Sequence, residues 1–179
     1  MPSKKVATFA TVATLAKRVL IGALMLSAGM ADLTGQARDP RTGVWRLNVA
    51  KSTYKPGPPP KSQTVTIEPS GQGEHVRSDA LNTNGTRVVT DYTAAYDGND
   101  YPIKGSPVAN TVTLKRIDAR TTERFDKKDG HVMLVYRRVV SPDGKTMTVT
   151  IEGVNAQGQK VNNVVVFEKQ SPPSKPPTT

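Results

Sequence analysis

Cysteine is absent from the 179 residues of this chain, histidine occurs twice and tryptophan once. Without cysteine the chain cannot form disulfides, thiolate metal sites or a cysteine nucleophile, so packing and backbone pairing must supply its stability. The histidines, His75 and His131, are too few for a zinc site unless carboxylates such as Glu74 or Asp79 complete the ligand set. We therefore expect no metal and no other cofactor.

Recognisable catalytic motifs are also missing. The sequence contains neither a Gly-x-Ser-x-Gly nucleophile elbow nor a glycine-rich phosphate loop. Carboxylates that could converge for glycoside hydrolysis occur at Asp91, Asp97, Asp100, Glu123 and Asp126, but aspartates are also the usual occupants of turns. The sequence favours a non-enzymatic protein, and a periplasmic enzyme of unknown type remains an alternative.

Helical periodicity is lacking from residue 38 onward, and a two-residue alternation takes its place. Trp45, Leu47 and Val49 alternate with polar residues, and the same period recurs in segments 110–117 and 146–152. This alternation is typical of strands with one buried face.

Turn signals separate these segments. Asn-Gly or Asp-Gly, the strongest short hairpin signal, begins at Asn84, Asp97, Asp129 and Asp143, and type I′ turns at these places would require positive φ at both central residues. The proline-rich segment 55–61 cannot be a helix or a central strand and is expected to be an extended crossover.

Regular spacing of short strands and tight turns indicates an all-β fold. We predict a single antiparallel up-and-down β-barrel of about nine or ten strands, because closure removes the exposed edges of a long meander. A sandwich is the alternative architecture. The barrel domain is expected to span residues 38–170, and the tail at 171–179, with four prolines, is expected to be disordered.

The N-terminus has the pattern of an export signal. Basic residues precede an apolar run at 19–28, and small residues follow it, with cleavage expected after Ala31 or Ala37. The run is shorter than the roughly 20 residues of a membrane span. We expect residues 1–37 to form a signal helix and the protein to be periplasmic or extracellular. The alternatives are an uncleaved anchor and a surface helix.

The chain is basic, with a net charge of +10. Residues 1–37 carry four of the positive charges and one negative charge, so their removal lowers the net charge to +7. The remaining charges occur as scattered doublets such as Lys127-Lys128, without interleaved aromatic residues, which predicts a solvated surface. We expect a monomer with no nucleic-acid partner and no stable membrane insertion.

The opening of the first strand, Gly43-Val44-Trp45, resembles the Gly-x-Trp start of the lipocalin and fatty-acid-binding (calycin) families. The stretch 162–169 is similar to the last strand of the fatty-acid-binding barrels. Segment 45–52 near the start of the barrel domain and segment 155–164 near its end also resemble the corresponding segments of a group of uncharacterised secreted bacterial β proteins. The resemblance implies a small barrel whose tryptophan closes one end.

Two departures separate this chain from the fatty-acid-binding proteins. The proline-rich segment stands where those proteins have a helical pair, and their carboxylate-binding Arg-x-Tyr corresponds here to Val165 and Phe167. The resemblance therefore implies the fold, without that route of carboxylate capture.

Two arginines share the phase of the aliphatic positions on their strands. Arg138 follows Val132, Leu134 and Tyr136 at two-residue spacing, and Arg116 follows Val112 and Leu114. A barrel interior built this way predicts an apolar cavity with cationic anchors, suited to a small hydrophobic or amphipathic anionic ligand. The predicted ligand-binding residues are Trp45, Leu47, Val112, Leu114, Arg116, Tyr136, Arg138, Val165 and Phe167.

Three interpretations of function follow. The first is a non-enzymatic binding module for such a ligand. The second is a structural or envelope-interaction protein whose barrel is filled by its own side chains, and the third is the periplasmic enzyme of unknown type. For both arginines, snorkelling to water or pairing with Asp118 or Asp143 is the alternative to ligand binding.

Overall fold

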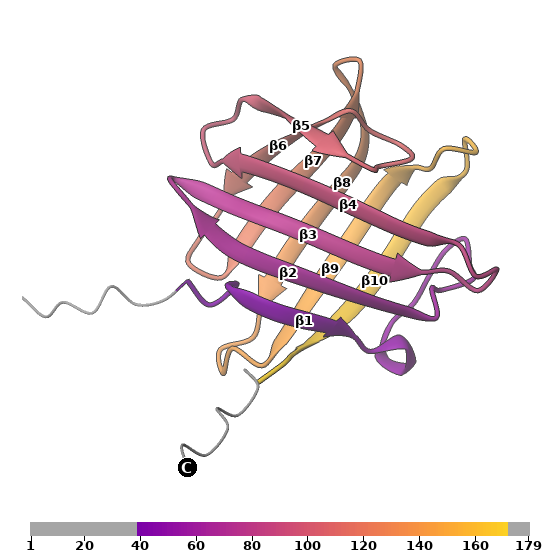
Figure 1. Ribbon diagram of the computed structural model, residues 1–179, viewed down its shortest axis with the longest axis horizontal. Coiled ribbons are helices and arrows are strands. Elements are labelled where there is room, and N and C mark those ends of the chain that lie inside the picture. Colours follow the sequence, from indigo (N-terminus) through magenta and orange to yellow (C-terminus); the bar gives the residue numbers. More distant parts are fainter. Residues whose placement is uncertain (1–38, 172–179) are drawn as a thin grey trace, which may run out of the picture. The chain divides into compact units, whose positions relative to one another are not determined.

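The computed structural model describes residues 39–171 and shows ten β-strands in one closed antiparallel barrel (Figure 1). Every strand pairs with its neighbours in sequence, and the first strand also pairs with the last. The strands are β1 (Gly43–Leu47), β2 (Ser62–Ser70), β3 (Gly73–Leu81), β4 (Arg87–Ala95), β5 (Asp100–Lys104), β6 (Thr111–Arg116), β7 (Thr121–Lys128), β8 (His131–Val140), β9 (Thr146–Val154) and β10 (Lys160–Lys169).

Closure between β1 and β10 confirms the predicted up-and-down barrel and rules out a sandwich. Trp45 lies opposite Lys169 in this ladder, and Leu47 lies opposite Phe167. The expected signal helix at 1–37 and the tail beyond residue 171 lie outside the described residues. Within residues 39–171, no helix has the length and apolarity needed to cross a bilayer.

The segment between β1 and β2 is an extended crossover, as its prolines predict. It begins with a single 3₁₀ turn at Val49–Lys51, capped by the side chain of Asn48. Thr53 then forms a bridge with Val164 of β10, so the crossover runs beside the barrel wall. This path carries the next residue, Tyr54, to the rim of the interior.

The four predicted turns occur where the sequence places them, but three are not of the predicted type. Their glycines all have positive φ. Of the non-glycine residues that the structure describes, only Asp129 does (φ 50°), so only the Asp129-Gly130 turn satisfies the type I′ requirement. In two of the other turns the glycine amide donates to the carbonyl three residues earlier, from Gly85 to Asn82 (3.0 Å) and from Gly144 to Ser141 (2.9 Å). A left-handed glycine after a type I turn makes the same reversal.

The alternating apolar residues fill the barrel. Trp45, Val112 and Leu114 are fully buried, and the Trp45 indole Nε1 donates a hydrogen bond to the Arg41 carbonyl (2.7 Å). The segment before β1 is thereby tied to the core. The buried apolar residues are Trp45, Leu47, Val65, Ile67, Val76, Tyr92, Ala94, Ile103, Val108, Ala109, Val112, Leu114, Leu134, Val140, Met147, Val149, Val165 and Phe167.

Glycine is required where β9 crosses close to β8. Gly153 has φ +136°, and a Cβ placed there would lie 2.0 Å from the Met133 carbonyl oxygen. Gly85, in the β3–β4 turn, also has positive φ but has open space around it. Of these two glycines, Gly153 combines a positive φ with a clash against main chain, and Gly85 has the positive φ alone.

We expect Gly153→Ala to destabilise the barrel well beyond the roughly 1–2 kcal/mol of a left-handed alanine, because the β8 backbone must also move. Gly85→Ala is the control and should lose no more than that amount. Urea unfolding of the two variants measures the difference. Equal losses of unfolding free energy in the two variants would show that the close approach of β9 to β8 adds no cost beyond backbone strain.

An acidic and basic cluster occupies the outer face of β3 and its neighbours. His75 Nδ1 lies 3.3 Å from Glu68 on β2, and His75 Nε2 lies 3.2 Å from Asp91 on β4. Hydrogen bonds to Glu68 and Asp91 raise the pKa of His75 above its usual range. A raised folded-state pKa means that protonated His75 stabilises the fold below the unfolded pKa of about 6.5.

This contribution should disappear as pH rises through the folded-state pKa. We expect the difference in Tm between the wild type and His75→Gln to be larger at pH 5.5 than at pH 8.5, and to shrink in high salt because the cluster is exposed. Thermal melts at both pH values test it. A difference that grows with pH would contradict the assignment.

Candidate functional site

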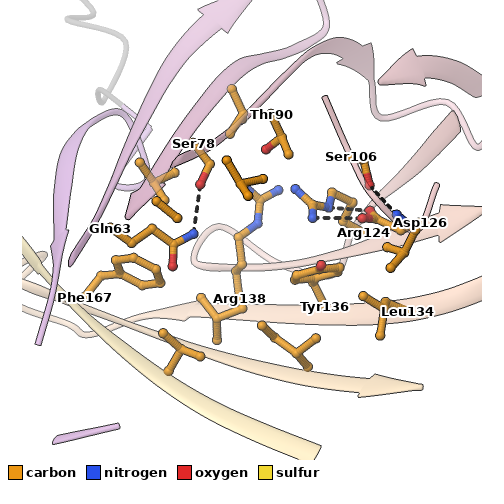
Figure 2. Close-up of a pocket in the computed structure, with 18 of the residues that line it drawn as sticks. Gln63, Ser78, Thr90, Ser106, Arg124, Asp126, Leu134, Tyr136, Arg138 and Phe167 are labelled. Carbon is orange, nitrogen blue, oxygen red and sulfur yellow. Dashed lines mark hydrogen bonds and ion pairs between the residues drawn. The ribbon is translucent and has the colours of Figure 1, made fainter. Parts of the chain in front are cut away.

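A cavity of about 270 Å³ lies inside the barrel (Figure 2). It is bounded by residues of β2–β4 and β7–β10, by the β5–β6 loop and by the crossover. The lining residues are Tyr54, Gln63, Val65, Val76, Ser78, Ala80, Val88, Thr90, Ser106, Pro107, Val108, Arg124, Asp126, Leu134, Tyr136, Arg138, Met147, Val149, Ile151, Val165 and Phe167.

The cavity reaches toward the end of the barrel that holds the β3–β4 turn. Ala80 and Val88, which pair next to that turn, both line it. The β4–β5 ladder is short, with two register pairs, and the β5–β6 loop crosses the free part of β4 instead. A Cβ on Gly105 of that loop would lie 1.9 Å from the Val89 carbonyl oxygen, so this approach requires glycine.

One side of the cavity is aliphatic. Side chains at alternate positions of β9 and β10, including Met147, Val149 and Val165, are nearly fully buried and continue the apolar core. Hydroxyl and amide groups occupy β2 and β3, where Gln63 Nε2 donates a hydrogen bond to Ser78 Oγ (2.8 Å). The cavity therefore has distinct apolar and polar walls.

A buried ion pair spans the interior beside the cavity. Arg138 on β8 donates from Nη2 to Oε1 of Glu74 on β3 at 2.5 Å, and the two side chains are 7% and 4% exposed. The hydroxyls of Tyr92 and Tyr96 also donate to Glu74 (2.8 and 2.5 Å). Burial opposes ionisation of Glu74, but Arg138 and the two tyrosines outweigh it and lower its pKa.

A second ion pair lies on β7. Arg124 and Asp126 are two residues apart, so both side chains point inward, and Arg124 Nε lies 2.7 Å from Asp126 Oδ1. The guanidinium stacks over Tyr136 (3.9 Å to the ring centroid) and lies 5.2 Å from the Tyr92 ring centroid. Burial raises the pKa of Asp126 and Arg124 opposes that rise. Tyr92, bonded to Glu74 and beneath Arg124, joins the two pairs.

Each interior arginine thus has its own carboxylate. We call the ion pairs Arg138–Glu74 and Arg124–Asp126, with Tyr92 between them, the buried network. Two cavity-lining side chains carry a buried donor without a hydrogen-bond or ion-pair partner among residues 39–171: Arg138 at Nε and Tyr54 at its hydroxyl. Such donors carry a desolvation cost that a bound acceptor would relieve.

Four of the nine predicted ligand-binding residues line the cavity: Tyr136, Arg138, Val165 and Phe167. Arg138 is inside, as its phase predicts, but it pairs with Glu74, and neither Asp118 nor Asp143 is its partner. Figure 2 shows its side chain rising from the barrel wall among the lining residues.

The other five lie elsewhere. Trp45, Leu47, Val112 and Leu114 are buried in the core but do not line the cavity. Arg116 lies outside the cavity with a side chain that is 42% exposed, 3.1 Å from Asp39 and 4.5 Å from the Tyr96 ring centroid. Its strand ends there, so the apolar phase of β6 does not carry the guanidinium into the interior.

Sequence reasoning missed Glu74, Arg124 and Asp126 as interior groups. Phe125 is the one apolar residue of β7, which suggests that the face of the strand carrying Phe125 is buried. The opposite face, which carries Arg124 and Asp126, is the one that lines the interior. The signal that could have corrected this is the pairing of Arg124 with Tyr136, whose own phase was identified correctly.

The carboxylates that could have converged are distributed over both faces of the sheet. Asp126 is inside, whereas Asp91 pairs with His75 and Glu123 pairs with Arg137 on the outer face. In the described part of the chain, no group of three or more histidine and acidic side chains is arranged to hold a metal ion.

No protein-family model matches this chain, and a search of curated proteins finds no match. Among solved structures, one match is the zebrafish ileal bile acid-binding protein complexed with cholic acid. The two chains are 11% identical, with a TM-score of 0.43 over 73% of this chain and 99% of the other.

The buried network makes a prediction about stability. Glu74→Gln or Arg138→Met alone leaves one buried charge without its counterion, and each should cost about 3–5 kcal/mol. The double variant should cost much less than the sum, because it removes both charges. Urea unfolding of the four proteins measures the coupling.

The outer-face pair Glu123 and Arg137 provides a matched control on β7 and β8, with 2.7 Å between the charged atoms. Because Arg137 is 48% exposed, its coupling to Glu123 should stay below about 1 kcal/mol. Equal coupling at both sites would show that burial does not strengthen the dependence of Arg138 on Glu74.

Proposed function

We propose that this protein is a non-enzymatic binding module that holds a small, mainly apolar ligand inside the barrel. The observation that carries the proposal is the interior cavity of about 270 Å³. Because liquid water occupies about 30 Å³ per molecule, this space equals about nine waters, or a ligand with on the order of ten non-hydrogen atoms. A barrel filled by its own side chains would leave far less room.

The walls of the cavity support an amphipathic ligand. Its apolar part would lie against Met147, Val149 and Val165, and its polar end against the side of Arg138 and Tyr54. Ligand sites commonly combine a mostly apolar lining with a few placed polar groups.

The state of the buried carboxylates favours binding over catalysis. Glu74 accepts from an arginine and two tyrosines, and Asp126 is held by Arg124. A general base needs a carboxylate that can reach the proton it abstracts. Both carboxylates instead neutralise arginines.

Export completes the proposal. The basic and apolar pattern of residues 1–37 supports secretion. We therefore place the binding activity in the periplasm or outside the cell, where the barrel would meet its ligand as a monomer.

Octan-1-ol is a suitable probe because its nine non-hydrogen atoms match the cavity. At about 0.7 kcal/mol per non-hydrogen atom we expect one site with a Kd on the order of 10 μM, measured by isothermal titration calorimetry. Ala80→Phe places a ring in the cavity and should weaken binding at least tenfold without a large loss of stability.

Leu81→Phe is the matched control, because Leu81 is the next residue of β3 and is 37% exposed on the outer face. It should bind octan-1-ol as the wild type does. Equal affinity of the wild type and Ala80→Phe for octan-1-ol would show that the ligand does not bind inside the cavity. Native mass spectrometry of protein purified from its own source can show a retained ligand directly.

A further inference from the structure

We infer that the polar end of the ligand is an uncharged hydrogen-bond acceptor, such as an alcohol, ketone, ester or amide oxygen, rather than a carboxylate or an ammonium group. This inference rests on the proposed function, since it specifies the ligand of the same cavity. It follows from the charge balance of the buried network and from the two unpartnered donors on cavity-lining side chains.

The charge balance comes first. The charged residues that line the cavity are Arg124, Asp126 and Arg138, and Glu74 is bonded directly to Arg138. Each guanidinium already faces a carboxylate at 2.5 to 2.7 Å, so the interior is neutral as a whole. An ionised ligand would add one uncompensated charge beside these buried pairs, and the desolvation cost of that charge would be unmet.

Arg138 is already paired with Glu74, so a ligand carboxylate on any of its donors would be a second anion at one guanidinium. A ligand carboxylate that took its Nη2 would compete with Glu74, which is 4% exposed and would keep only Tyr92 and Tyr96 as donors. Two carboxylates would then share one cation in the interior. Two carboxylates next to the same guanidinium would repel each other, and this repulsion disfavours ionisation of both.

The free donors set the polarity of the ligand. Arg138 Nε and the Tyr54 hydroxyl are buried, line the cavity through their side chains, and have no acceptor among the residues that the structure describes. Burial raises the pKa of Tyr54 to about 12, so the phenol keeps its proton. A ligand oxygen that reaches these atoms would relieve their desolvation cost. A ligand ammonium has no acceptor atom, so it could not satisfy the Arg138 Nε donor.

The Gln63 amide and the Ser78 hydroxyl do not alter this balance. They lie on the polar wall, and they hydrogen-bond each other at 2.8 Å. Neither carries charge, so they can adjust to an alcohol or a carbonyl but cannot neutralise an ion.

The test compares octan-1-ol with octanoate, which share a chain length and differ in head-group charge at pH 7.5. Calorimetry on the wild type should show octan-1-ol binding at least tenfold more tightly. Octanoate binding as tightly as the alcohol, or more tightly, would overturn the inference while leaving the proposed function standing. Failure of both probes to bind at millimolar concentration would overturn the proposed function itself.

The variant Glu74→Gln then tests whether the Arg138–Glu74 ion pair causes the preference for octan-1-ol. It leaves Arg138 without its counterion, so the preference for the alcohol over octanoate should fall at least tenfold. Asp79→Asn is the matched control, because it removes one carboxylate from the outer-face pair with Arg87 and leaves the cavity unchanged. An unchanged preference in a folded Glu74→Gln variant would refute the role of the ion pair. If that variant does not fold, the wild-type comparison decides the inference on its own.

Discussion

The ion pair between Arg138 and Glu74 is the constraint around which the interior is arranged. It joins β8 to β3, two strands that are not neighbours in the barrel, and so fixes the distance across the inside. Burying two charges costs more than their attraction returns unless the remaining polar atoms are also satisfied. Tyr92 and Tyr96 meet that requirement for Glu74. Of these four side chains, Arg138 lines the cavity, so the ion pair adjoins the site through its guanidinium side.

Most of the fold could be predicted from local pattern. Two-residue alternation located the strands, and Asn-Gly and Asp-Gly pairs located the hairpins, because each depends on residues close in sequence. The same local signal identified Arg138 as an interior residue. Turn type was harder, since a left-handed glycine can follow either a type I turn or a left-handed neighbour, and Asp129 alone among the described non-glycine residues takes the second course.

The site could be predicted only in part, for a geometric reason. The identity of the partner of Arg138 depends on which strand faces β8 across the barrel, and Glu74 is far from it in the chain. Strand β7 hides the second pair, because Phe125 is its one apolar residue and points to the outer face. The polar residues of β7 can face the interior because Asp126 pairs with Arg124 and because Tyr92 and Tyr136 cover the Arg124 guanidinium.

Pairing of the first strand with the last has a consequence for how the chain matures. β1 has no complete ladder until β10 has been made, because its second partner is the final strand of the barrel. A contact between such distant segments raises the contact order and slows folding. The barrel can therefore close only after β10 has been synthesised and is free to pair with β1.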